Sequence, residues 1–238
     1  MPPGTRLPFL VSGEHENDMG MLKMILSDHG PEPVFERRWA TGVEFSPDEF
    51  AGLVVLGDGS NNRATYKVFE KEQRWLRIAR TARRPVLGIC YGAQLLAAYQ
   101  TGRPNPCGLA GLNRRHGGVV EVELRGAGTT DPVLGPLRIS PLVTMSHEDC
   151  FQESGNATAL AWSACEQIEP HCEAFRVGEP DEAVYGLQFH PEPTLSMLRD
   201  EREGYRWFDE NLPEDVLRGV VETGEKVLRE WAERAASR

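Results

Sequence analysis

The chain has 238 residues, 40% of them hydrophobic and 26% charged, with a formal net charge of −10 and a sequence pI of about 5.2. This length and apolar content are enough to bury one large core, so we expect a single domain over residues 1–238. The acidic balance argues against nonspecific nucleic-acid binding and against an anionic membrane surface, and no apolar run approaches the length that crosses a bilayer.

Strands and helices are predicted to alternate through the first part of the chain. Apolar residues at helical spacing predict helices over 19–27 and 64–82, the first with Asp18 as its N-cap. Short apolar runs predict strands at 7–11, 33–35, 52–56 and 85–87. This order predicts an α/β fold, a flavodoxin-like and mostly parallel central sheet covered by helices on both faces.

The later part of the chain is predicted to add a small β segment and a long helix. Apolar residues at helical spacing from Val216 to Trp231 predict an amphipathic helix over 214–235, within a C-terminal helical extension of about 193–238. This helix either packs on its own domain or docks a partner subunit or a second copy of the chain. The added strands are expected at 118–124, 158–162, 173–177 and 183–185, the last two as a hairpin.

The five cysteines are odd in number and irregular in spacing, and the N-terminus lacks the basic-then-apolar pattern of a secretory signal. We therefore expect a reduced, cytoplasmic protein. Cys165 and Cys172 flank His171, but their spacing matches no common zinc pattern. We expect neither a metal nor a cofactor.

One cysteine is predicted to lie at a sharp turn between a buried strand and a helix. Cys90 follows the apolar run 85–87 and has Gly88 and Gly92 on either side, which let the backbone bend tightly. Such a nucleophile elbow lifts the sulfur clear of the sheet, and the helix N-terminus behind it favours a thiolate. The amide N–H of Tyr91 then points to where an oxyanion would form.

A candidate base for Cys90 lies far downstream, at the end of another predicted strand. Residues 185–192 read Tyr-Gly-Leu-Gln-Phe-His-Pro-Glu, which places His190 after the strand and Glu192 two residues on. An imidazole there can take the thiol proton, and the carboxylate can hold the ring in the right tautomer. Cys90, His190 and Glu192 are therefore the candidate catalytic residues.

The segments 88–94 and 186–192 together resemble the class I (triad-type) glutamine amidotransferases, whose signature is a G-x-C-x-G-x-Q elbow followed far downstream by H-P-E. The likeness is to a stand-alone glutaminase domain similar to the amidotransferase domain of GMP synthetase. It implies that the Cys90 thiolate attacks the side-chain amide of glutamine, that His190 transfers the proton, and that Glu192 balances the imidazolium.

The resemblance also implies an oxyanion strand upstream of the elbow. Residues 52–60 match it, with Gly57, Asp58 and Gly59 where the family usually carries Gly-Gly-Pro or Asn-Gly-Pro. It implies that the backbone N–H of Asp58 acts with that of Tyr91, and that the two glycines line the substrate pocket. A carboxylate beside a developing oxyanion is unfavourable unless it turns away or is paired.

Further substrate contacts follow from the resemblance. Gln94 lies one helical turn after the nucleophile and recognises glutamine in the family. Residues 143–149 resemble the family loop Met-Ser-His-Gly-Asp, which assigns Ser146, His147 and Glu148 to the amino-acid end of glutamine. His147 is alternatively a hydrogen-bonded loop histidine. Glu148 replaces a glycine, and its charge would repel an α-carboxylate or attract an α-amino group.

The leading hypothesis is a glutaminase subunit that forms a thioester on Cys90 and supplies ammonia to a separate synthetase or biosynthetic enzyme, since no Walker-type phosphate loop is present. A second is a stand-alone hydrolase of γ-glutamyl amides or peptides. A third is a catalytically silent regulatory or binding protein on the same fold. The expected substrate is glutamine or a γ-glutamyl compound, with no nucleic-acid or membrane partner.

Overall fold

The computed structural model describes residues 6–38, 40, 42–58, 66–101, 116–137, 141–147, 156–165, 168–199 and 212–238. The strands are β1 (Phe9–Gly13), β2 (Val34–Arg37), β3 (Gly52–Val55), β4 (Val86–Ile89), β5 (His116–Glu121), β6 (Glu123–Leu124), β7 (Leu142–His147), β8 (Ala157–Cys165), β9 (Ile168–Val177) and β10 (Val184–Leu187). The α-helices are α1 (Met21–His29), α2 (Tyr66–Thr81), α3 (Tyr91–Thr101), α4 (Leu195–Arg199) and α5 (Glu214–Ala236), with short 3-10 turns at Glu16–Met19, Gly126–Thr129 and Pro180–Glu182.

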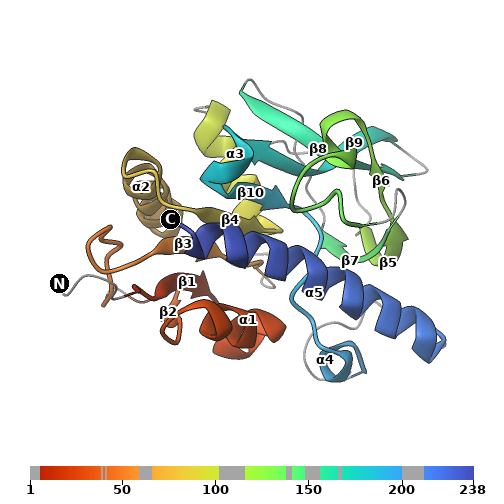
Figure 1. Cartoon of the computed structure of the whole chain (residues 1–238), viewed down its shortest axis with the longest axis horizontal. Helices are drawn as coiled ribbons and strands as arrows, with labels where there is room; N and C mark the ends of the chain where they lie inside the picture. Colours follow the sequence, from red (N-terminus) through yellow and green to blue (C-terminus); the bar gives the residue numbers. More distant parts are fainter. Residues whose placement is uncertain are drawn as a thin grey trace.

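The main sheet follows the order β2-β1-β3-β4-β10-β9-β8-β6 (Figure 1). Strands β2, β1, β3, β4 and β10 are parallel, whereas β9, β8 and β6 continue the sheet in antiparallel fashion. The expected α/β fold with a mostly parallel central sheet is therefore confirmed. Because parallel strands point the same way, the carboxyl ends of β3, β4 and β10 meet at one edge of the sheet.

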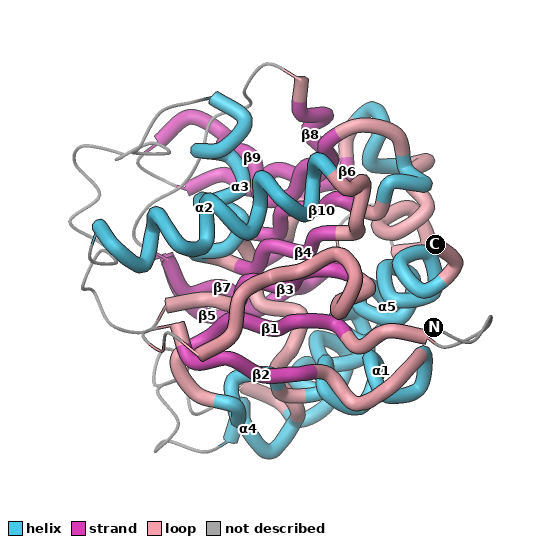
Figure 2. Tube along the Cα trace, turned by 90° about the vertical axis from the view of Figure 1, so that its left-hand side faces the viewer, coloured by secondary structure: helices cyan, strands magenta, loops and turns pink. Residues whose placement is uncertain are grey.

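Helices cover both faces of the parallel part of the sheet, with α1 and α5 on one side and α2 and α3 on the other (Figures 1 and 2). Alternation along β3 produces the two cores: Val54 packs in the core that contains residues of α1 and α5, and Leu53 and Val55 pack in the core that contains residues of α2 and α3. Both layers thus bury a continuous apolar strand, as the sequence of 52–56 indicates.

The C-terminal helix α5 packs on its own chain, against α1 and β7. Trp231 is fully buried, stacks at a tilt on Phe9 with ring centroids 5.5 Å apart, and donates its indole N–H to the carbonyl O of Ala183 at 2.9 Å. Self-packing is therefore the role that the structure shows for the apolar face of α5. None of the described helices combines the length and the apolar character needed to cross a membrane.

The first helix begins later than its sequence pattern predicts, and Asp18 does not cap it. Gly20, at φ +48°, occupies the N-cap of α1, while the Asp18 carboxylate accepts a hydrogen bond from the backbone N–H of His15 at 2.9 Å. Met21 N donates to the carbonyl O of Glu192 at 2.9 Å, and a Cβ on Gly20 would overlap that same oxygen. A contact with a distant segment therefore sets the start of α1.

Two predicted β segments also differ from the structure. The run 118–124 is not one strand, because β5 pairs with β7 in a small separate sheet and β6 pairs with β8 in the main sheet. Between them, Val122 N donates to the carbonyl O of Pro141 at 3.0 Å. The segment 143–149, expected as a loop, is strand through His147, and its remaining residues lie outside the described part of the chain.

Two glycines of α5 provide a matched test of this packing. Gly219 is exposed with open space around it, so Gly219→Ala is expected to raise the free energy of unfolding by about 0.5–1 kcal/mol through helix propensity. A Cβ on buried Gly224 would overlap the backbone carbonyl of Pro191, so Gly224→Ala is expected to lower it by about 1–3 kcal/mol. Urea unfolding measures both values, and equal stabilisation by the two changes would contradict the packing.

Candidate active site

The segments after β3, β4 and β10 lie against one another, as the shared edge of a parallel sheet requires. Cys90 follows β4 directly, Gly57 comes after β3, and His190 comes after β10. A Cβ placed on Gly57 would lie 2.9 Å from His190 Cε1 and 3.5 Å from Cys90 Cβ. The structure therefore brings together three segments that the sequence assigned separately to a site, and it leaves no room for a side chain at position 57.

The turn at Cys90 has the geometry of a nucleophile elbow. Cys90 has φ +51°, in the left-handed region that a non-glycine residue adopts only at a cost of about 1 kcal/mol or more. A Cβ on Gly88 would overlap the carbonyl of Gly92, and a Cβ on Gly92 would overlap the carbonyl of Val55. Both positions require glycine, because the start of α3 lies in direct backbone contact with β4, the strand before it, and with β3.

Both the ring and the backbone of His190 form hydrogen bonds that fix its position. Its Nδ1 lies 2.6 Å from Glu192 Oε1, and both side chains are largely buried. Its backbone forms an isolated bridge with Thr144 of β7: His190 N donates to Thr144 O at 2.8 Å, and the Thr144 hydroxyl donates to His190 O. A neutral ring in this orientation carries its proton on Nδ1, beside the carboxylate.

Charges around His190 favour its protonated form. Burial on its own disfavours the imidazolium, but the negative charges of Glu192 and of a Cys90 thiolate, with hydrogen bonds to both, raise the pKa of His190 well above its usual value. The imidazolium form of His190 is therefore favoured beside Glu192 and Cys90.

Polar groups of three segments surround the sulfur. Cys90 Sγ lies 3.6 Å from the carbonyl O of Ser146 and 3.6 Å from Nε2 of Gln188. Gln94 Nε2 donates to Gln188 Oε1 at 3.3 Å. Gln94 and Ser146 are thus close to Cys90, as the sequence indicates. Gln188 is an additional residue close to the sulfur, and the sequence signal for it was a polar amide between the apolar residues Leu187 and Phe189.

Of the other residues expected to contact the substrate, the structure describes only His147. His147 is buried, and its side chain lies against Glu173, with Nε2 3.7 Å from Oε1. Gly59 and Glu148 lie outside the described residues.

The carboxylate of Asp58 is paired with a buried arginine. Asp58 Oδ2 lies 3.4 Å from Nη1 of Arg38, whose side chain is completely buried. Nη2 of Arg38 donates to the carbonyl oxygens of Leu56 at 2.7 Å and Gly57 at 3.1 Å, and its Nε lies 3.1 Å from Glu72 Oε1. The guanidinium therefore contacts the Leu56–Asp58 segment at three points and neutralises the charge that the sequence placed beside the oxyanion.

The same arginine contacts the elbow. Its guanidinium carbon lies 4.3 Å from the ring centroid of Tyr91, and Ser12 of β1 donates its hydroxyl to Glu72 Oε1 at 2.7 Å. Burial, followed by the negative charge of Glu72, raises the pKa of Tyr91 so far that the phenol stays neutral. Arg38 and Glu72 were not among the predicted site residues. Glu72 shares the helical spacing of Trp75, a charge on a buried face that could have revealed it.

Known proteins share this sequence pattern and this fold. The model of the family described as "Glutamine amidotransferase class-I" matches residues 39–202, which is more than half of the chain. The protein therefore belongs to the class I glutamine amidotransferase family.

Two curated relatives and one solved structure are similar to this chain. It is 32% identical over 155 residues to GMP synthase (glutamine-hydrolyzing) of Thermus thermophilus, covering 60% of this chain and 27% of the relative. It is 33% identical over 108 residues to one subunit of the glutamine-hydrolyzing GMP synthase of Haloarcula marismortui, covering 45% and 51%. A glutamine amidotransferase from Thermotoga maritima has the same fold, with a TM-score of 0.71, 21% identity and coverage of 98% and 99%.

These alignments cover only part of each curated relative. The matched regions amount to 27% of the Thermus protein and 51% of the Haloarcula protein.

Replacing Glu192 with glutamine tests the charge coupling at the site. Because Glu192 raises the pKa of His190, the imidazolium of Glu192→Gln loses its proton at lower pH and no longer stabilises the thiolate. We expect alkylation of Cys90 by iodoacetamide to slow about tenfold near neutral pH, with its pH profile displaced to higher pH. Mass spectrometry of the labelled peptide gives the rate. Glu222→Gln, on the exposed side of α5, should retain the wild-type profile, and an unchanged profile in Glu192→Gln would refute the coupling.

Proposed function

We propose that this protein is a glutaminase subunit that hydrolyses the side-chain amide of glutamine through a thioester on Cys90 and supplies the ammonia to a separate synthetase. The observation that carries the proposal is the placement of Cys90 at a strained strand–helix turn beside an imidazole whose Nδ1 lies 2.6 Å from the Glu192 carboxylate. The chain's membership of the class I glutamine amidotransferase family supplies the reaction class.

The reaction follows from the charge state of the pair. The Cys90 thiolate attacks the amide carbon of glutamine, and His190 gives its Nε2 proton to the leaving nitrogen as ammonia departs. A γ-glutamyl thioester remains. His190 then takes a proton from water, whose oxygen attacks the thioester carbon, and glutamate leaves with the thiolate restored. Glu192 keeps the ring oriented and balances the imidazolium throughout.

Backbone geometry supports an oxyanion hole formed by Asp58 and Tyr91. The peptide bonds of the described residues are all trans, so each N–H points away from the carbonyl of the same peptide unit. The Gly57 carbonyl points to Arg38, and the next N–H, that of Asp58, is therefore directed away from Arg38. Tyr91 opens α3, where an N–H has no acceptor within the helix. We infer that these two N–H groups stabilise the negative oxygen.

The ion pair with Arg38 explains how the Asp58 carboxylate is compatible with an oxyanion hole. An anion beside a developing oxyanion would oppose the reaction, but this carboxylate faces a fully buried guanidinium. We infer that Arg38 acts as a positioning residue, because it binds the carbonyl oxygens of two successive peptides, those of Leu56 and Gly57, and holds the Asp58 carboxylate aside.

The glutamine end of the site has a polar pair close to the sulfur. Gln94 and Gln188 are hydrogen-bonded to each other, and Gln188 Nε2 lies 3.6 Å from Cys90 Sγ. We infer that these two amides orient the carboxamide of glutamine for attack.

The likeness to the relatives supports a partner that uses the ammonia. The Thermus relative is a glutamine-hydrolyzing GMP synthase, and the Haloarcula relative is one subunit of such a synthase. We infer that the synthetase for this protein is a separate chain, and that glutamine hydrolysis is faster in its presence.

Labelling with a diazoketone analogue of glutamine tests the proposed pocket. We expect the analogue to alkylate Cys90 stoichiometrically, because it binds as glutamine and then traps the thiolate. Free glutamine should protect the site, and Cys90→Ala should remain unlabelled. Mass spectrometry locates the adduct, with the buried Cys172 of β9 as an internal reference. Labelling that glutamine does not prevent, or that is equal at both cysteines, would overturn the proposal.

Arg38→Lys tests the positioning role. Lysine keeps the positive charge but has no planar fork to bind Leu56 O, Gly57 O and Asp58 together. We expect kcat for glutamine hydrolysis to fall about 10- to 100-fold with little change in KM, since the oxyanion donors act mainly in the transition state.

Arg80→Lys is the matched control, because Arg80 also lies in a partly buried ion pair, with Glu182, away from the site. It should retain the wild-type kcat. A rise in KM at constant kcat in Arg38→Lys would argue against a role in the oxyanion hole.

A further inference from the structure

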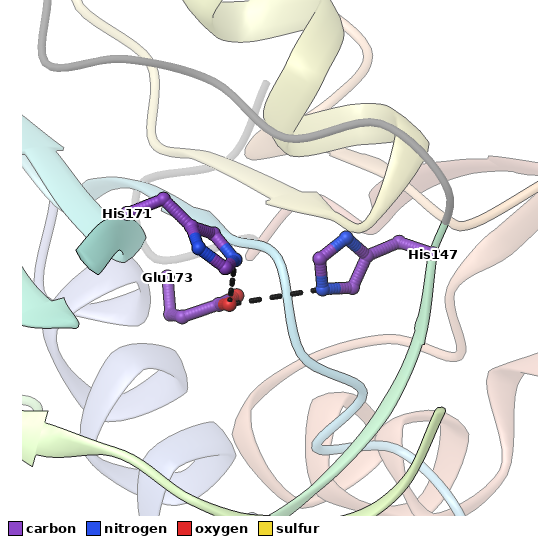
Figure 3. A group of neighbouring side chains, drawn as sticks. All are labelled: His147, His171 and Glu173. Atoms are coloured by element: carbon purple, nitrogen blue, oxygen red, sulfur yellow. Dashed lines mark ion pairs between the residues drawn. The ribbon is translucent and has the colours of Figure 1, made fainter. Parts of the chain in front are cut away.

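A second group of chemically reactive side chains lies next to the proposed active site. His147 ends β7, and His171 and Glu173 lie two residues apart on β9, so that their side chains share one face of the strand. Figure 3 shows the two imidazole rings converging on the carboxylate. Nε2 of His171 lies 2.7 Å from Glu173 Oε1, and Nε2 of His147 lies 3.7 Å from the same oxygen.

This group is buried. The side chains of His147, His171 and Glu173 are 1%, 7% and 0% exposed. Charged groups in a protein interior are paired or coordinate metal ions, and this carboxylate has two imidazole rings beside it. Neutral imidazoles and a carboxylate are both ligands that metal ions bind.

We propose that His147, His171 and Glu173 form a binding site for one divalent transition-metal ion, with zinc as the best match. Two imidazole nitrogens and one carboxylate oxygen suit zinc and its neighbours in the first transition series, whereas magnesium and calcium prefer oxygen ligands. The three donor atoms lie within 4.8 Å of one another. Three protein ligands leave one tetrahedral position for water.

The spacing of the donors is close to what the ion requires. Zinc bonds of about 2.1 Å in a tetrahedral site place two donor atoms roughly 3.4 Å apart. The separations from Glu173 Oε1, 2.7 Å to His171 and 3.7 Å to His147, lie on either side of this value. The third pair of donor atoms, on the two histidines, lies within 4.8 Å.

The surroundings of Glu173 match those of a metal ligand. The hydroxyl of Ser163, directly opposite His171 on β8, donates to Glu173 Oε1 at 2.5 Å. Hydrogen bonds of this kind orient a ligating carboxylate. All three ligands come from strands, which hold side chains more precisely than loops do.

Successive side chains of β9 face opposite sides of the sheet, which explains why the sequence pattern of Cys165, His171 and Cys172 did not indicate this site. Cys172 lies between His171 and Glu173 and therefore faces the opposite side of β9, where it packs in the core that contains α2 and α3. Its thiol donates to the carbonyl O of Ala174 at 3.2 Å. The expectation that no metal binds rested on grouping His171 with its neighbouring cysteines, whereas its partner from another strand is His147.

The ion would be structural and would support the neighbouring site. His147 follows Ser146, whose carbonyl lies 3.6 Å from Cys90 Sγ, and Gln188 N donates to the carbonyl O of Glu173 at 2.8 Å. Linking β7 to β9 through a metal therefore fixes two groups that contact the sulfur. This site does not depend on the proposed glutaminase function, because binding is measured without substrate.

Titration of the purified, chelator-treated chain with Zn²⁺ tests the proposal. We expect isothermal titration calorimetry to give one ion per chain, with a melting temperature that rises with free Zn²⁺ because the folded state binds the ion. Co²⁺ in the same site should show the visible absorption of four-coordinate cobalt. Wild-type protein that binds no stoichiometric Zn²⁺ would overturn the proposal.

Variants assign the binding to these residues. Glu173→Gln, which is isosteric, and His171→Ala are each expected to weaken Zn²⁺ binding by at least about 100-fold, since loss of an outer-sphere partner alone costs 10- to 100-fold. His29→Ala, at the end of α1, should bind as the wild type does. Circular dichroism of the metal-free variants confirms that they are folded. Equal binding by Glu173→Gln and wild type would place the ion elsewhere and refute the site.

Discussion

The buried guanidinium of Arg38 is the interaction on which the arrangement of the strand ends depends. Removing a charge of this size from water costs several kcal/mol unless its donors are used, and here they contact Glu72, Asp58 and two backbone carbonyls. These contacts join the end of β2, the segment after β3 and helix α2, and the planar group also lies on the ring of Tyr91. One side chain thus sets the relative position of the elbow and of the Gly57–Asp58 peptide.

Close backbone contacts at glycines provide the second constraint. Gly92 brings α3 against the end of β3, whereas Gly20 and Gly224 bring α1 and α5 against Glu192 and Pro191. The two helices on one face of the sheet therefore hold the segment that carries His190, and the helix on the other face, α3, directly follows Cys90. Because proteins are close-packed, the separation of sulfur and imidazole is determined by helix packing on both faces.

Much of the fold could be predicted, because it follows from local patterns. The apolar run 52–56 and the Gly-x-Cys-x-Gly turn encode a strand and an elbow within a few residues, and the structure has both. Predictions that depend on distant partners were less accurate. Asp18 has the chemistry of an N-cap, yet Gly20 caps α1 because only glycine allows Glu192 to approach. Likewise, the alternation over 118–124 does not show that its two halves join different sheets.

The sequence by itself determined the alternation of strands and helices that leads to the elbow, and the identity of the candidate groups at Cys90, His190 and Glu192, since hydrophobic period and motif spacing are local properties. Only the tertiary structure decided which groups lie beside the buried charged and titratable side chains. The Asp58 carboxylate faces Arg38, and the His147 ring faces Glu173. The physical reason is that a buried charge is stabilised by whichever partner the folded chain places beside it, and neither partner is near in sequence.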